Sequence, residues 1–328
     1  MTSPVSKAYR PPRWLPGGHL QTLYSVLLAP RPRIDYRRER WEAPDGDFVD
    51  LDWVDAPAPA PLVVLFHGLE GSSKSHYAQT MMALLQERGW SGVVVNFRGC
   101  SGEMNRRPRA YHSGDSDELD WILRRLHKLA AGAPLCAAGV SLGGNALLKW
   151  LGEDRAQSTD LLRAAAAICA PIDLRVSGDH LGLGVNRIYT RHFLRTLKAK
   201  ALQMLVRFPS LANREAVAKA RTLRAFDDCF TAPVHGFRDT DHYWSALSSK
   251  SWLKTIRIPT LIINTLNDPF VPSRSLPTPA EVSDAVTLEY PDFGGHVGFV
   301  SGVYPGRLNW LPSRIYSYFA GVIGAEKG

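Results

Sequence analysis

Short apolar runs alternate with amphipathic stretches through the middle of the chain, from residue 61 to residue 171. The first run, 62–68 (LVVLFHG), is continuous and begins with aliphatic residues, which is typical of a strand buried on both faces. Further runs follow at 93–99, 134–140 and 164–171. Strands and helices that alternate at this spacing predict an α/β fold, with a mostly parallel sheet covered by helices on both faces.

The stretches between these runs have helical periodicity. Tyr77, Met81 and Leu85 recur every four residues, and Gly89 ends the helix that they predict. Asp115 and Glu118 have the spacing of a capping box and are followed by apolar residues on one helical face. This pattern predicts a second helix that begins at about residue 115.

The alternation is interrupted once. Helical stretches dominate between about Asp173 and Thr255, and strands resume at 260–270 and 286–293 before a C-terminal helix. A sheet with one helical interruption indicates a single domain with an inserted cap. The predicted boundaries are 1–172 and 256–328 for the core and 173–255 for the helical cap.

Residues 186–208 within the cap predict an amphipathic helix. Its two faces differ in chemistry, with basic side chains on one and apolar side chains on the other. We interpret it as a helix with one solvated face, and contact with a membrane surface or an acidic headgroup is the alternative. The basic residues are Arg187, Arg191, Arg195 and Lys198, and the apolar ones are Phe193, Leu194, Leu197, Ala201 and Leu205.

The composition is basic, with 39 Lys and Arg against 31 Asp and Glu among 328 residues and a net charge of +8. Arginines cluster at 31–40 and 98–109, but no nucleic-acid-binding module contains them. We therefore expect no nucleic-acid partner. We interpret the 98–109 segment as a solvated loop, with contact to a phospholipid headgroup as the alternative.

The four cysteines indicate a reducing compartment. Cys100, Cys136, Cys169 and Cys229 lie far apart without a CxxC pair, which favours reduced, packed thiols over disulfides or zinc ligands. No apolar run approaches the roughly 18–20 residues that span a bilayer, and the first residues lack the apolar core of a secretory signal. We expect a cytoplasmic protein without a transmembrane segment, of unspecified oligomeric state.

The most specific local motif is Gly139-Val140-Ser141-Leu142-Gly143, which lies between a predicted strand and a helix predicted over 142–152. A nucleophilic serine needs to stand on a sharp strand-to-helix turn, and small neighbours allow the chain to make that turn. The helix N-terminus behind Ser141 favours developing negative charge. Ser141 is therefore the predicted nucleophile.

A serine nucleophile needs a base, and the base needs an orienting carboxylate. His296 is the best-placed histidine, because the glycines before it allow a loop after a late strand to approach another strand end. Asp268 stands at the end of the strand that begins at residue 260, and Asp173 is the competing acid. The order Ser141, Asp268, His296 is that of the α/β-hydrolases.

The amides that would bind an oxyanion follow from the same arrangement. In α/β-hydrolases one N–H belongs to the residue after the nucleophile, here Leu142, and the other to a loop after an earlier strand, here at Leu69. His67 ends that strand, and we expect it to brace the loop. No HExxH, P-loop or GxGxxG motif is placed to bind a metal or a nucleotide, so we predict neither a metal nor a cofactor.

Seven segments carry a family resemblance: WLPGGHLQTL (14–23), HGLEGSS (67–73), NFRGCSGEMNRRPRAYHSG (96–114), GVSLGGN (139–145), FDDCFTAPVHGF (226–237), NDPF (267–270) and GGHVGF (294–299). Together they resemble the YheT-like branch of the α/β-hydrolases, which includes bacterial hydrolases, yeast medium-chain ethyl-ester synthases and mammalian ABHD lipases. The resemblance covers nearly the whole chain. It implies a Ser141–Asp268–His296 triad that hydrolyses or transfers the acyl groups of carboxylic esters.

The function predicted from the sequence is therefore a carboxylesterase or lipase-like hydrolase that acts on a small-molecule or lipid ester. An acyltransferase with an alcohol acceptor is the alternative, and a non-catalytic ligand-binding sensor on the same scaffold is the alternative from another class. His112 and Asp117 form an HxxxxD pattern that resembles a motif associated with acyl transfer in this branch. The competing explanation is that residues 113–117 cap the following helix.

Overall fold

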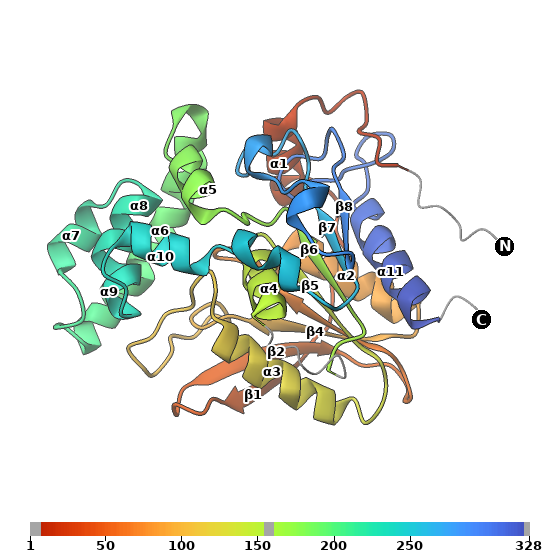
Figure 1. The fold of residues 1–328 in the computed structure, drawn as a ribbon, viewed down its shortest axis with the longest axis horizontal. Helices are drawn as coiled ribbons and strands as arrows, with labels where there is room; N and C mark the ends of the chain where they lie inside the picture. The colour runs from red at the N-terminus through yellow and green to blue at the C-terminus, as the bar shows by residue number, and fades with distance from the viewer. Residues whose placement is uncertain (1–7, 154–160, 325–328) are drawn as a thin grey trace.

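A twisted eight-stranded sheet forms the centre of the computed structural model, which describes residues 8–153 and 161–324 (Figure 1). The strand order is β1-β2-β4-β3-β5-β6-β7-β8. β1 and β2 pair antiparallel to their neighbours, and the remaining six strands are parallel. The strands are β1 (Arg37–Glu42), β2 (Phe48–Val54), β3 (Leu62–Phe66), β4 (Ser91–Asn96), β5 (Leu135–Val140), β6 (Ala164–Ile168), β7 (Thr260–Ile263) and β8 (Val286–Glu289).

Helices cover both faces of this sheet, which confirms the predicted α/β fold. α3 and α4 pack on one face, and α2 and α11 pack on the other. The apolar residues that predicted the first two helices, such as Met81 and Leu123, are fully buried in these layers. The helices of the core are α1 (Gly18–Leu27), α2 (His76–Glu87), α3 (Ser116–Leu129), α4 (Leu142–Gly152) and α11 (Trp310–Ile323).

The helices between β6 and β7 occupy the segment predicted as the cap, residues 173–255, and pack around a third apolar cluster. In Figure 1 they lie beside and above one end of the sheet. They comprise α5 (Leu174–Leu181), η1 (Gly184–Asn186), α6 (Arg187–Arg207), α7 (Arg214–Lys219), α8 (Leu223–Phe226), the π-helical η2 (Asp227–Thr231), α9 (Ala232–Val234), α10 (Thr240–Leu247) and η3 (Lys250–Thr255). Two short 3-10 helices follow β7, namely η4 (Ser273–Ser275) and η5 (Pro279–Glu281).

Three elements lie outside the predicted pattern. They are α1 and the antiparallel strands β1 and β2. β1 reads RRERWE and has no apolar alternation, because its arginines pair across the strands with acids of β2. Arg40, for example, lies 2.8 Å from the buried carboxylate of Asp50.

The arginine-rich segment 98–109 is not simply a solvated loop, so that prediction was wrong for its first residue. Arg98 is buried and lies 2.5 Å from Glu118, 2.9 Å from Asp45 and 3.1 Å from Asp47. A buried guanidinium requires such partners, because an unpaired charge in the interior is strongly destabilising. Glu118 therefore pairs with Arg98, while Asp115 caps α3 by accepting a hydrogen bond from the Glu118 amide.

The four cysteines are free, as the sequence predicts. No helix within residues 8–153 and 161–324 is both long and apolar enough to cross a bilayer.

One buried asparagine on α4 ties the core to the cap. The Asn145 amide nitrogen donates to the Ser113 carbonyl at 2.7 Å and to the Leu247 carbonyl at 2.9 Å. Its side-chain oxygen accepts a hydrogen bond from the Ser249 amide at 3.0 Å. One side chain therefore satisfies three backbone groups, one in the core loop before α3 and two near the end of the cap.

Two buried histidines hold loops at the carboxyl edge of the sheet. His67 donates from Nδ1 to the Gly68 carbonyl at 2.7 Å and accepts from the Phe97 amide at Nε2, so it braces its loop as predicted. His76 at the start of α2 donates to the Val297 carbonyl at 2.9 Å. Burial lowers the pKa of each imidazole to about 4.

Replacement of Asn145 should destabilise the fold. Asn145→Ala leaves three buried backbone groups unpaired, and we expect the free energy of unfolding to fall by about 2–4 kcal/mol. Asn213→Ala is the control, because it removes an exposed helix cap at the start of α7 and should cost about 1 kcal/mol. Urea unfolding of both variants tests this, and equal losses would contradict the anchoring role of Asn145.

The buried histidines should make the fold sensitive to mild acid. In the unfolded chain these histidines become protonated below their ordinary pKa of 6.5, whereas in the fold His67 and His76 become protonated only below about pH 4. The unfolded state therefore binds more protons between these two values, and the free energy of unfolding falls as the pH falls through this window. His76→Gln should reduce the loss of unfolding free energy between pH 7 and pH 5 by about 1–2 kcal/mol. The control His242→Gln changes an exposed histidine and should leave this loss of unfolding free energy unchanged, as measured by urea unfolding at both pH values. Equal pH dependence in wild type and His76→Gln would refute the assignment of the acid sensitivity to His76.

Candidate active site

Ser141 stands on a sharp turn between β5 and α4. Its backbone adopts φ 52° and ψ −120°, a left-handed conformation that is costly for a residue with a side chain. The Ser141 amide donates to the Ile168 carbonyl of β6 at 2.8 Å, which holds the turn against the sheet. The turn thus has the strained strand-to-helix form that an exposed nucleophile requires.

The glycines around Ser141 are required by close backbone contacts. A Cβ atom at Gly139 would lie 2.4 Å from the Gly143 carbonyl oxygen, and one at Gly143 would lie 2.4 Å from the Phe66 carbonyl oxygen. A Cβ at Gly68 would lie 3.0 Å from that of Ser141. Side chains at the first two positions would therefore force the turn apart.

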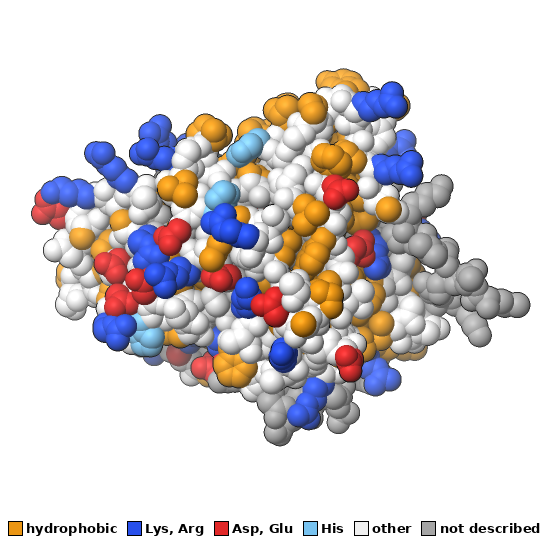
Figure 2. All heavy atoms as spheres, turned by 45° about the horizontal axis from the view of Figure 1, so that its top comes forward, with side chains coloured by type: hydrophobic (Ala, Val, Ile, Leu, Met, Phe, Trp, Pro, Cys, Tyr) orange, Lys and Arg blue, Asp and Glu red, His pale blue; other side chains and the backbone are white. Residues whose placement is uncertain are grey.

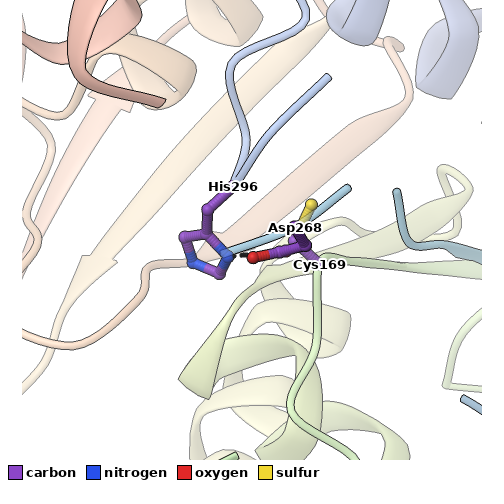
Figure 3. A group of neighbouring side chains, drawn as sticks. All are labelled: Cys169, Asp268 and His296. Carbon is purple, nitrogen blue, oxygen red and sulfur yellow. Dashed lines mark hydrogen bonds and ion pairs between the residues drawn. The ribbon is translucent and has the colours of Figure 1, made fainter. Parts of the chain in front are cut away.

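His296 and Asp268 meet from the loops that follow β8 and β7 (Figure 3). The His296 Nδ1 and the Asp268 Oδ2 are 2.9 Å apart, and the carboxylate is completely buried. The other carboxylate oxygen accepts hydrogen bonds from the amides of Phe270 at 2.7 Å and Val271 at 3.2 Å. These two bonds fix the carboxylate, which in turn fixes the imidazole.

The competing acid occupies a different place. Asp173 is the N-cap of α5 and accepts a hydrogen bond from the Val176 amide at 3.1 Å. The hydrogen bonds of the described residues thus connect His296 to Asp268 and employ Asp173 as a helix cap.

The loop that carries His296 is held by the first helix. Thr22 of α1 accepts a hydrogen bond from the His296 amide at 2.8 Å, and Gln21 accepts one from the Gly294 amide at 2.8 Å. Asn267 links the two loops, since it accepts from the Gly295 amide and donates to Gln21. These positioning residues are not among the predicted site residues, and their signal in the sequence is the family resemblance of the segment 14–23.

Cys169 lies beside the Asp268–His296 pair (Figure 3), and ligand atoms of the three residues fall within 4.8 Å of one another. The Cys169 sulfur accepts a hydrogen bond from the Val297 amide at 3.4 Å. Burial raises the pKa of this thiol well above its ordinary value, which keeps it protonated. Each of the three side chains thus has protein partners, and a neutral thiol is a poor metal ligand.

The two predicted oxyanion donors flank Ser141. Leu142 is the first residue of α4, and Leu69 lies in the loop after β3. The amides on either side of Leu69 are occupied, because Gly68 donates to the Tyr77 hydroxyl and Glu70 donates to the Tyr111 hydroxyl. No hydrogen bond within residues 8–153 and 161–324 engages the Leu69 amide itself.

Ser141 and His296 line one cavity of about 110 Å³, together with Leu69 and Leu142. No hydrogen bond joins the Ser141 side chain to His296 among the described contacts. Most of the remaining wall is apolar and comes from the cap, including one face of α5. The cap residues that line it are Leu174, Ser177, Gly178, Leu181, Phe193, Leu197, Leu223, Phe226, Asp227, Thr231, Tyr243 and Trp244.

His112 of the HxxxxD pattern also lines this cavity. Its Nε2 lies 3.6 Å from Asp115, and burial lowers its pKa to about 4. Asp115 is also the N-cap of α3 and pairs with Arg109 at 2.7 Å. The capping explanation of this segment is therefore confirmed at Asp115.

Comparison with known proteins agrees with this geometry. Residues 61–303 match the family model of the alpha/beta hydrolase fold. The chain is 39% identical over 98% of its length to "Putative esterase YheT" of Escherichia coli, 95% of which is covered. It is 31% identical to human "Phospholipase ABHD3", with 96% of this chain and 79% of that protein covered.

Two further comparisons extend this picture. A yeast "Medium-chain fatty acid ethyl ester synthase/esterase 2" is 29% identical, with 88% of this chain and 66% of that protein covered. An esterase structure from Pyrococcus furiosus superimposes with a TM-score of 0.56 at 17% identity and covers 96% of this chain and 98% of that one, which supports the fold. The strained serine turn, the strand order and these relatives together show that the chain belongs to the YheT-like branch of the alpha/beta hydrolase family.

Proposed function

We propose that the protein is a serine esterase in which Ser141, His296 and Asp268 form the catalytic triad. The observation that carries the proposal is the buried 2.9 Å hydrogen bond between His296 and Asp268, in a cavity that also contains Ser141 on its strained turn. The hydrolase family and its esterase-named relatives support the same chemistry. The family supports hydrolase activity, and our proposal is that the bond it hydrolyses is a carboxylic ester.

The proposed reaction uses the two nitrogens of His296 for different tasks. Nδ1–H donates to Asp268, so Nε2 is left to accept the Ser141 proton as Oγ attacks the acyl carbonyl. The Leu69 and Leu142 amides would hold the negative charge that develops on the carbonyl oxygen. The alcohol leaves with the proton from Nε2, and water then attacks the acyl-enzyme to release the acid and restore Ser141.

The lining of the cavity favours a substrate whose acyl group is apolar. Its wall consists mainly of leucine and aromatic side chains from the cap, such as Leu181, Phe193 and Trp244. Burial of an alkyl chain against these residues is favourable by about 0.8 kcal/mol per methylene group. The phospholipase and ethyl-ester names of the relatives agree with such a substrate.

Transfer of the acyl group to an alcohol is the second candidate. It needs the same acyl-enzyme and differs only in the acceptor that attacks it. The yeast relative named as both synthase and esterase favours this possibility. The ratio of ethyl ester to free acid formed in the presence of ethanol distinguishes the two outcomes.

Loss of the Ser141 hydroxyl should abolish the reaction. We expect Ser141→Ala to lower kcat/KM for a p-nitrophenyl ester by about 10⁴-fold or more and to prevent labelling by a fluorophosphonate probe. Ser210→Ala alters an exposed serine and serves as the control. Equal labelling of Ser141→Ala and wild type would refute the assignment, and ester binding without turnover by the wild type would favour a ligand-binding sensor.

The two candidate acids should respond differently to amidation. In Asp268→Asn the amide can still accept from Phe270 and Val271, but its NH₂ favours the wrong tautomer of His296, and we expect kcat to fall by about 10³–10⁴-fold. Asp173→Asn keeps a helix cap and should retain wild-type kcat. Circular dichroism verifies folding, and a larger loss of kcat in Asp173→Asn would identify Asp173 as the acid instead.

A further inference from the structure

A group of aliphatic side chains is exposed at one edge of the molecule. Leu27 and Leu28 at the end of α1 are each 70% exposed, and Val303 in the loop before α11 is 86% exposed. Apolar groups exposed together, rather than scattered singly, mark surfaces that contact something other than water. We name this group the exposed apolar face: Leu20, Leu23, Val26, Leu27, Leu28, Leu183, Val185, Ile188, Val303 and Tyr304.

Three segments far apart in the sequence form this face, and side-chain contacts join them. His19 of α1 is 3.1 Å from the Tyr189 hydroxyl of α6, next to the exposed Ile188. Trp14 packs against both Tyr24 of α1 and Tyr304, at ring distances of 5.0 and 5.5 Å. In Figure 1 α1 and α5 rise together above the sheet, and Figure 2 shows hydrophobic side chains along that edge.

The same three segments contain no acidic residue. Residues 8–34, 180–214 and 293–324 hold 13 of the 39 Lys and Arg residues and none of the 31 Asp and Glu residues. The rest of the chain, with 26 basic and 31 acidic residues, is net negative. The excess of basic residues along the sequence therefore lies in these segments, and two of their cations, Lys200 and Arg314, pair with Glu70 and Glu289 outside them.

Several of these cations are available to a partner. Arg31, Arg33, Arg187 and Arg191 are exposed, and none of them forms an ion pair with an acid of the described residues. Arg187 and Arg191 lie one helical turn apart at the start of α6, on either side of the exposed Ile188 in the sequence. Aliphatic side chains bordered by unpaired arginines complement a surface that is apolar inside and anionic outside.

The face adjoins the candidate active site. Tyr189, which contacts His19 of α1, packs its ring 4.7 Å from that of Phe270, and Phe270 stacks on His296 at 4.2 Å. Leu181, two residues before the exposed Leu183, lines the cavity with Ser141. A surface bound at this face would lie beside the cavity.

We propose that the exposed apolar face docks the protein on an anionic lipid bilayer. Leu27 and Leu28 insert among the acyl chains, and the arginines of α6 and of residues 31–33 contact lipid phosphates. A bilayer fits better than a protein partner, because the exposed aliphatic side chains are bordered by arginines that form no ion pair among the described residues. The docking does not depend on the chemistry at Ser141; only the delivery of a lipid ester to the cavity rests on the proposed function.

Vesicle co-sedimentation tests the proposal. With the Ser141→Ala chain, so that no lipid is hydrolysed, we expect binding to vesicles of phosphatidylcholine mixed with phosphatidylglycerol and much weaker binding to phosphatidylcholine alone. The double change L27D/L28D should lower partitioning onto the anionic vesicles by about tenfold or more. Arg187→Gln with Arg191→Gln should give a similar loss, because each arginine near the surface contributes about 1 kcal/mol.

The matched control is Leu129→Asp, which changes a 56% exposed leucine at the end of α3, at the opposite edge in Figure 1, and should leave partitioning unchanged. In the active chain, L27D/L28D should retain the wild-type rate on soluble p-nitrophenyl acetate.

No binding of the Ser141→Ala chain to anionic vesicles, or equal binding by L27D/L28D, would overturn the proposal. A dimer that L27D/L28D converts to monomers would also overturn it, since a second copy would then cover the face. Vesicle binding by a protein that hydrolyses no ester would refute the proposed function and leave the docking intact.

Discussion

At the turn between β5 and α4, backbone packs directly on backbone. The Gly143 backbone lies so close to the end of β3 that a Cβ atom there would sit 2.4 Å from the Phe66 carbonyl oxygen. This contact presses the start of α4 against the sheet and leaves Ser141 its left-handed conformation. It also directs α4 so that Asn145, one turn along, reaches the core loop at Ser113 and the end of the cap at Ser249. The positions of the serine and of the cap over it therefore depend on the same close approach.

The other half of the site depends on long-range hydrogen bonds rather than on close packing. The loops after β7 and β8 are held by Thr22 and Gln21 of α1, which lie 246 to 274 residues earlier in the chain. The buried Asp268 carboxylate is fixed by two amides of its own loop. The site thus combines a rigid turn in the middle of the chain with two loops that its first helix holds in place.

This division explains what could be predicted from the sequence. Buried parallel strands are continuous apolar runs, and the turn that carries Ser141 has a local glycine pattern. The parallel sheet and this strand-to-helix turn could therefore be predicted from the sequence. β1 was not, because its arginines are satisfied by acids of β2 and leave no apolar alternation. The burial of Arg98 and the role of Gln21 could not be predicted for a similar reason, since the partners of Arg98 lie 20 to 53 residues away and those of Gln21 in the two site loops lie 246 and 273 residues away.

The distribution of charge follows from how the acids are used. Asp45, Asp47 and Glu118 neutralise the buried Arg98, and Asp50 pairs with Arg40 of β1, so these four acids are already paired with cations. Arg31, Arg33, Arg187 and Arg191, by contrast, are exposed and form no ion pair among the described residues. Unpaired cations at one edge of a molecule orient it in the field of an anionic surface before contact is made. The orientation that this favours brings the edge beside the candidate active site toward the anionic side, which is the arrangement that an enzyme acting on membrane esters requires.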